Sequence, residues 1–459
     1  MPIFEINSWR GGIADDDDKG IKGACKFSSN CDPRKQVDSL SCGQALAAEG
    51  AGVIVDLVRF WVKCSDGNTY GFGNLGKIYK RTSAGVITVV YTDPDGAIKG
   101  ACEKPSTTTK YLYWANNTKL KRKEIPGLSN WTDVTTVGTN LTAADWHTMK
   151  QIGGALKIAN LNKLALVGYD NSYNPDAVDL IPGNISKTIV ERNGRAIIGT
   201  YKTGDPNKGI NAAIDSEVPL AQVGDDGEIY FANMNNSMSS KRFPGGGKVN
   251  PGGVTTLIED TFFFEWEETA LSWIDKQNIG NMALFAVYSA DAGYNGIYSY
   301  GRKNKNHPFI LNLEYLTSDY DELGAITVID GTIIFSYKDG ATYGVKKVDS
   351  TTKATGTYYS LDFKAPVKNP ANITPWKYIE LFMSPLPSGA SVAFYYKMNK
   401  TGSWVQATLA NGTTTYSVAN GKKAVFNIGA EGEIYEHKII LTPTSNSSPE
   451  IYRSRTYFI

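Results

Sequence analysis

The chain has 459 residues and a nearly balanced charge, with 47 lysines and arginines against 46 aspartates and glutamates. A neutral chain has no global field to steer it onto nucleic acid or an anionic membrane. With 26 tyrosines, 46 glycines and 11% aromatic residues, the composition favours strands and tight turns over helices. No apolar run approaches the roughly 18 residues of a transmembrane helix, and the first residues lack the pattern of a secretory signal. These features predict an all-β protein without a membrane-spanning segment or a specific nucleic-acid partner.

The five cysteines are odd in number and irregularly spaced. This pattern argues against a disulfide framework and favours synthesis in a reducing cytosol. Cys25, Cys31 and Cys42 are close in sequence, but their spacing matches no zinc pattern, so buried thiols are expected. The three histidines stand far apart, which gives no support for a histidine-based metal site or a catalytic triad. The sequence therefore predicts neither a metal nor another cofactor.

Residues 1–50 are expected to form an extended arm. Apolar residues are sparse in this stretch, and it carries a run of four aspartates at positions 15–18 that is typical of a solvated segment. Trp9, Phe27 and Leu40 are isolated large side chains, as expected of a segment that becomes ordered on binding. We therefore predict that the arm orders mainly against other subunits, with these three residues as assembly anchors.

Residues 51–366 carry recurring hairpin signals. The sequence DGNTYG at 66–71 occurs again as DGATYG at 339–344, each time after an apolar run. Asp-Gly between alternating apolar segments is a strong hairpin signal, because a type I′ turn needs positive φ at both central residues. Hairpins that recur over such a length are typical of a β-propeller, and roughly 45 to 50 residues per blade predicts about six or seven blades. The two copies are predicted to occupy equivalent positions in neighbouring first and last blades.

Residues 367–459 follow a linker rich in proline and lysine. The segments beyond it alternate apolar and polar residues with a period of two, and Asn411-Gly412 and Asn420-Gly421 mark turns. This pattern predicts a C-terminal antiparallel β-sandwich.

The most suggestive chemical cluster lies near the middle of the chain. Propellers include glycosidases, which need a pair of carboxylates around the sugar. Glu265 and Glu267 flank Trp266, and Trp273 follows, so these four residues are the candidate glycan contacts. A solvated acidic patch is the favoured interpretation, since no arginine cluster or second marked acid accompanies them. We therefore predict no catalytic residue and a protein that is not an enzyme.

Three stretches resemble propeller-bearing structural proteins of tailed-bacteriophage virions. The segment from Trp9 to Leu40 looks like the arm that precedes such propellers, and the sequence NGIYSYGRK at 295–303 looks like one of their blade hairpins. The C-terminal module, with SVAFYYK at 391–397 and then Trp404, looks like their terminal sandwich.

The resemblance implies a virion structural protein, a rigid scaffold in the tail, neck or hub that joins other subunits. The expected partners of this chain are other virion proteins, and several copies of the chain are expected to form a homo-oligomeric ring or cluster. It would be made in the host cytoplasm without a signal peptide and be located in the virion. The alternative is a carbohydrate-binding or glycoside-cleaving propeller that acts as a receptor-binding tail protein and contacts a host-surface glycan.

Overall fold

A computed structural model describes most of the chain. The described residues are 2–9, 11–14, 23–32, 39–105, 109–180, 184–192, 195–202, 220–223, 229–232, 240–243, 258–259, 271–279, 282–289, 295–301, 310–364 and 373–459. All regular elements among them are β-strands, which confirms the all-β prediction.

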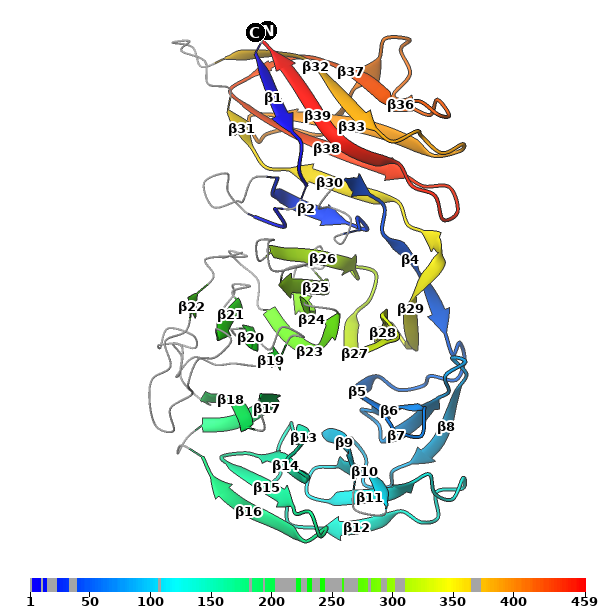
Figure 1. Ribbon diagram of the computed structural model, residues 1–459, viewed down its shortest axis with the longest axis vertical. Coiled ribbons are helices and arrows are strands. Elements are labelled where there is room, and N and C mark those ends of the chain that lie inside the picture. The colour runs from blue at the N-terminus through cyan, green and yellow to red at the C-terminus, as the bar shows by residue number, and fades with distance from the viewer. Residues whose placement is uncertain are drawn as a thin grey trace.

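Seven antiparallel sheets follow one another around a ring in the described part of the chain (Figure 1). The first sheet contains β5 (Val58–Lys63), β6 (Thr69–Gly73), β7 (Lys77–Arg81) and β8 (Ile87–Thr92). The second contains β9 (Gly100–Pro105), β10 (Lys110–Ala115), β11 (Leu120–Ile125) and β12 (Thr135–Gly138). The third contains β13 (Met149–Ile152), β14 (Ala155–Asn160), β15 (Lys163–Val167) and β16 (Tyr173–Asp179). The fourth sheet contains β17 (Asn184–Arg192) and β18 (Arg195–Lys202). The fifth contains β19 (Leu220–Val223), β20 (Ile229–Ala232), β21 (Ser240–Phe243) and β22 (Ile258–Glu259). The sixth sheet contains β23 (Leu271–Ile279), β24 (Met282–Ser289), β25 (Gly296–Gly301) and β26 (Ile310–Leu316). The seventh contains β27 (Glu322–Ile329), β28 (Thr332–Asp339), β29 (Thr342–Lys353) and β4 (Gln44–Glu49).

The first strands of these sheets form the inside of the ring. Strand β5 contacts β9, and the contacts continue through β13, β17, β19, β23 and β27, which returns to β5. The last sheet is completed by β4, which precedes the first sheet in sequence and pairs with β29. Because the sheet that closes the ring combines strands from both ends of the repeat, the propeller is held closed by backbone hydrogen bonds. The predicted propeller fold is confirmed.

Neighbouring sheets of the ring are held together by separate hydrophobic cores. Phe72 of the first sheet packs in one cluster with Trp114 of the second, and Val58 packs with Ile334 across the closing point. Each of these side chains is less than 1% exposed. Since each core is formed by two sheets, a sheet removed from the ring would leave its neighbour's core open to water.

Two further sheets form a module at one side of the ring (Figure 1). One contains β1 (Ile3–Ile6), β39 (Glu450–Phe458), β32 (Thr374–Met383), β37 (Lys423–Gly432), β35 (Thr408–Leu409) and β3 (Leu40–Ser41). The other contains β2 (Cys25–Ser29), β30 (Gly356–Ser360), β38 (Ile434–Thr442), β33 (Ser391–Met398), β34 (Val405–Gln406), β31 (Phe363–Lys364) and β36 (Thr415–Tyr416). Buried residues from both sheets, such as Phe394 and Phe426, belong to one core. We call this unit the two-sheet module.

The two-sheet module and the propeller share that core. Its buried residues include Phe285 and Leu311 of the sixth ring sheet together with Trp9 and Tyr358 of the module. The chain crosses between the two parts twice, from β3 to β4 and from β29 to β30, and the crossings touch. The backbone amide of Ala354 donates to the Gly43 carbonyl at 3.1 Å, and the Lys353 ammonium donates to the Cys42 carbonyl at 2.9 Å. We call this paired crossing and its shared core the junction.

The N-terminal segment differs from the prediction that it orders mainly against other subunits. Strands β1 and β3 pair with β39, β2 pairs with β30 and β4 pairs with β29, all within this chain. Strand pairing also crosses the predicted boundaries at residues 50 and 366, because β4 belongs to a propeller sheet and β30 to the module. The physical reason is that pairing satisfies backbone groups and so needs few apolar anchors.

The two similar hairpins are not equivalent, contrary to the prediction. They lie in neighbouring sheets, but Asp66-Gly67 joins the first and second strands of one sheet, whereas Asp339-Gly340 joins the second and third strands of the other. Their loops also differ, because Lys63 pairs with Thr69 in the first and Asp339 pairs with Thr342 in the second. Two nearly identical short sequences thus share a glycine with positive φ, 82° in Gly67 and 57° in Gly340, but differ in their place in a blade.

Within the described residues, no helix is long and apolar enough to cross a membrane.

Candidate functional site

A cavity of about 460 Å³ lies on the inside of the ring. It is lined by the first strands of five sheets, β5, β9, β13, β17 and β23, so its wall is built from segments far apart in the sequence. Ligand pockets in proteins have volumes of about 300 to 1,000 Å³, and this cavity falls in that range. We call it the channel cavity.

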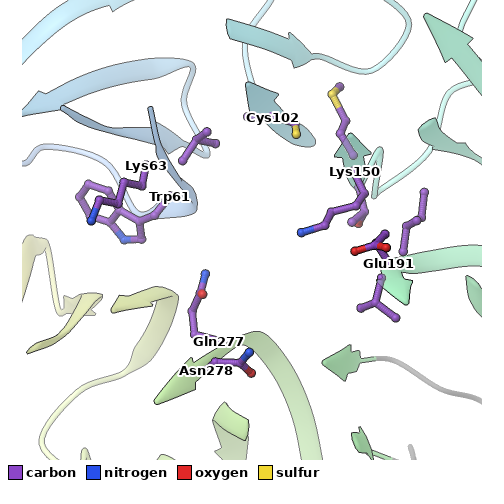
Figure 2. A pocket seen from close by; sticks show the side chains of 13 residues that line it. Trp61, Lys63, Cys102, Lys150, Glu191, Gln277 and Asn278 are labelled. Atoms are coloured by element: carbon purple, nitrogen blue, oxygen red, sulfur yellow. The ribbon is translucent and has the colours of Figure 1, made fainter. Parts of the chain in front are cut away.

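Polar side chains from several strands reach the channel cavity. They are Lys63 of β5, Thr148 directly before β13, Lys150 of β13, Glu191 of β17, and Gln277 and Asn278 of β23. Figure 2 shows Lys150 and Gln277 pointing into the open space from their strands. The ammonium of Lys63 lies 3.5 Å from the carboxylate of Asp330, with both side chains largely exposed. The cavity therefore offers two ammonium groups, a hydroxyl, a carboxylate and two amides, a set that can both donate and accept hydrogen bonds.

Trp61 and Cys102 form less polar parts of the wall. The Trp61 indole is 8% exposed, and its Nε1 donates to the Ala325 carbonyl at 3.3 Å, which fixes the ring between two sheets. Burial raises the pKa of the Cys102 thiol to about 11, and the nearby Lys150 ammonium offsets part of this rise. The thiol is therefore protonated at neutral pH and is a poor nucleophile.

The described lining of the cavity includes groups that form hydrogen bonds and charge interactions. No group of three or more histidine, cysteine or acidic side chains that could hold a metal ion occurs among the residues the structure describes. Glu191 is the carboxylate that reaches the cavity from the described strands. Hydrogen bonding and charge interactions with a polar ligand are what these groups can perform.

One of the four residues predicted as glycan contacts, Trp273, lies in the described part of the chain. Glu265, Trp266 and Glu267 lie outside the described residues. Trp273 lies in β23, the strand that supplies Gln277 and Asn278 to the channel cavity.

The predicted assembly anchors lie inside the protein or against it. Trp9 is 1% exposed and packs edge-on against Tyr358, with ring centroids 5.0 Å apart, and Leu40 is fully buried. Phe27 is half-buried beside Tyr359. Trp9 and Leu40 therefore anchor the N-terminal segment to this chain's own core, which differs from the prediction that they bind other subunits.

Sequence reasoning missed the polar residues of the channel cavity. Lys150 and Gln277 stand in unremarkable strand sequences, and only their position on the first strand of a sheet distinguishes them. An alignment of the repeats that identifies the first strand of every sheet would have found these residues. The repeats in this sequence are too dissimilar to be aligned in that way.

No protein-family model matches the sequence. No curated protein matches it either. Solved structures do match the fold at low identity. A streptogramin B lyase has a TM-score of 0.45 and 14% identity over 66% of this chain and 97% of that chain. The WD40 β-propeller domain of Doa1 has a TM-score of 0.42 and 12% identity over 66% of this chain and 95% of that chain. The PQQ-bound aldose sugar dehydrogenase from Streptomyces coelicolor has a TM-score of 0.41 and 11% identity over 66% of this chain and 98% of that chain.

These structures correct one prediction from the sequence. We expected a protein that is not an enzyme, but a lyase and a sugar dehydrogenase are among the solved structures of similar fold. The prediction was based on the lack of a recognisable catalytic set in the sequence, and a propeller can assemble its site from distant first strands. At such low identity the likeness concerns the fold alone.

Proposed function

We propose that the protein is a structural component of a tailed-bacteriophage particle, in which it holds other virion subunits at fixed positions. The junction is the observation that carries this proposal. A scaffold must resist bending between its parts, and here two touching chain crossings and one shared core connect the propeller to the two-sheet module. The resemblance of three sequence stretches to virion propeller proteins supports the same role.

The test is the presence of the protein in purified particles of the phage that encodes it. Mass spectrometry of gradient-purified particles should find the protein at a constant ratio to the other structural subunits. A density map of the particle should then contain the ring and the two-sheet module as one body. Particles that lack the protein would overturn the proposal.

We also propose a second function, the binding of a glycan in the channel cavity, as a receptor-binding tail protein would require. The cavity favours this function because Lys150, Glu191 and the amides of β23 present both donors and acceptors, which suit the hydroxyl groups of a sugar. The volume of about 460 Å³ suits a short saccharide rather than a single ion.

A glycan array with the purified protein, followed by calorimetry on any saccharide found, tests this second function. Lys150→Ala and Gln277→Ala should each weaken binding about tenfold, since a hydrogen bond to a neutral or charged group contributes roughly 1–2 kcal/mol. Lys110→Ala is the matched control, because Lys110 is an exposed strand lysine outside the cavity lining. Binding that is unchanged in both cavity variants would exclude the channel cavity as the glycan site.

A further inference from the structure

Two cysteines face each other at the junction. Cys31 and Cys42 are partners in an isolated antiparallel β-bridge, although ten residues separate them in sequence. The amide of Gly43 donates to the Asn30 carbonyl at 2.6 Å, and the amide of Asp32 donates to the Ser41 carbonyl at 2.9 Å. These bonds flank the bridge, so the two cysteines form a non-hydrogen-bonded pair, the kind in which opposite side chains are closest.

This register suits a disulfide without movement of the backbone. Opposite residues of a non-hydrogen-bonded pair have Cα atoms about 4.5 Å apart, and disulfides span Cα separations of about 4.4–6.8 Å. The Cys31 thiol donates to the Thr357 carbonyl at 3.6 Å and the Cys42 thiol to the Leu441 carbonyl at 3.3 Å. These are weak hydrogen bonds, so a rotation of each side chain toward the other gives up little.

Gly356 of β30 packs closely against the two cysteines. A Cβ atom added to Gly356 would lie 3.2 Å from the Cys31 sulfur and 3.6 Å from the Cys42 Cα, so the glycine sits over both cysteines. Cys31 is 1% exposed and Cys42 is fully buried.

We propose that Cys31 and Cys42 are a modification site, where an intramolecular disulfide forms when the protein meets a disulfide oxidant such as oxidised glutathione. The thiolate of one cysteine attacks a sulfur of the oxidant, breaks its S–S bond and releases one glutathione thiol. The second cysteine then displaces the other glutathione from the mixed disulfide. Two protons and two electrons leave the protein, and the oxidant becomes two thiols.

The disulfide would strengthen the junction. Cys42 directly precedes the crossing from β3 to β4, and Cys31 follows β2 of the two-sheet module. Burial raises the pKa of both thiols, so the thiolate fraction is small at neutral pH. Thiol–disulfide exchange is therefore slow at pH 7 and faster at pH 8.5. A slow reaction suits a bond that forms only after the protein has folded and left a reducing cytosol.

The third cysteine nearby provides the sharpest control. Cys25 is also buried in the shared core, but its thiol donates to the Gly12 carbonyl at 3.4 Å and it has no cysteine opposite it in a strand pair of the described chain. The proposal therefore excludes Cys25 from the bond.

The experiment is peptide mapping after oxidation. The full-length protein is held in oxidised glutathione, both as folded protein and during refolding from denaturant, then alkylated and digested with trypsin. Trypsin separates Cys31 from Cys42 at Arg34 and Lys35, so a linked peptide pair reports the bond directly.

We expect free thiols to fall from five to three in the wild type and from four to two in Cys25→Ser, with Cys31 and Cys42 as the linked pair in both. The pair should be absent from Cys31→Ser and Cys42→Ser. A linkage through Cys25, or five free thiols in the wild type after both treatments, would overturn the proposal. The wild-type map decides the question by itself if a serine variant fails to fold.

Discussion

At the scale of single residues, the ring is closed by a buried ion pair as well as by backbone bonds. Glu49 ends β4 in the last sheet, and its carboxylate accepts two bonds from the Arg81 guanidinium of the first sheet, at 2.6 and 2.8 Å. Both side chains are less than 10% exposed, and the Lys347 ammonium lies 3.3 Å from the same carboxylate. A buried arginine that loses its partner destabilises a protein by about 3–5 kcal/mol.

We therefore expect Glu49→Gln to lower the free energy of unfolding by about 3 kcal/mol, measured by urea titration. Glu322→Gln is the matched control, because Glu322 also pairs with an arginine of the first sheet, Arg59, at 2.9 Å. That pair is partly exposed, so its loss should change the free energy by less than about 1 kcal/mol. Equal losses in the two variants would show that burial does not set the strength of the Glu49 pair.

A second residue makes the two-sheet module sensitive to acid. His437 is fully buried among aromatic rings, with the Phe363 and Phe394 centroids 5.8 and 5.5 Å away, and neither ring nitrogen has a hydrogen-bond partner among the described residues. Burial lowers the pKa of His437 to about 3. Between pH 3 and the unfolded value near 6.5, the unfolded chain binds the proton and the folded chain does not. Stability therefore falls as the pH drops through this window.

The free energy of unfolding should fall by up to about 1.4 kcal/mol per pH unit from this group below pH 6. His437→Leu keeps a similar volume without the titration, so its stability should depend less on pH between 4 and 6. Phe394→Leu alters the same aromatic cluster and should lower stability equally at each pH. Urea titrations at several pH values measure both slopes, and an unchanged slope in His437→Leu would contradict the assignment.

At the scale of elements, the first four strands are integral parts of sheets. The sequence predicted that residues 1–50 would be an extended arm that orders mainly against other subunits. The structure instead gives β4 the outer position in the closing sheet and gives β1 and β2 the edges of the two module sheets. A chain without residues 1–50 would expose the edges of β29, β30 and β39, and unpaired edges favour aggregation.

We expect deletion of residues 1–50 to yield aggregated protein or a large loss of thermal stability, measured by scanning fluorimetry and size-exclusion chromatography. Deletion of residues 1–6 removes only β1 and exposes one module edge, so it should lower the melting temperature less. A truncated chain that melts like the full-length protein would contradict the role given to β4.

Strands and turns were predictable from the sequence because their signals are local. Asp330-Gly331 carries such a local signal, and it joins β27 to β28 with positive φ at both residues, 51° and 76°. Sheet membership was not predictable, because β4 and β29 are separated by about three hundred residues and their pairing leaves no local pattern. The channel cavity was missed for the same reason, since Lys150 and Gln277 meet only when the ring closes.

At the scale of the whole molecule, the propeller and the two-sheet module form one body. Both chain ends lie in the module, where β1 pairs with β39, the last strand (Figure 1). The N-terminal segment then passes through the shared core, where the Ile13 amide donates to the Leu311 carbonyl of β26 at 2.8 Å. Neither part can lose its structure without exposing buried surface of the other, so we expect them to unfold together.

Trp9 is the residue at which this coupling can be tested. It is buried in the shared core, which also contains Phe285 and Leu311 of the sixth ring sheet, and it packs edge-on against Tyr358 of the module. Scanning calorimetry of the wild type should show one transition. Trp9→Ala removes a large buried side chain, which costs about 3–5 kcal/mol, and should separate the transition into two as the parts lose their common core. Trp404→Ala, at a half-buried position on the outer face of the module, should leave a single transition. Two transitions in the wild type would mean that the parts fold independently and that the junction is not what makes the molecule rigid.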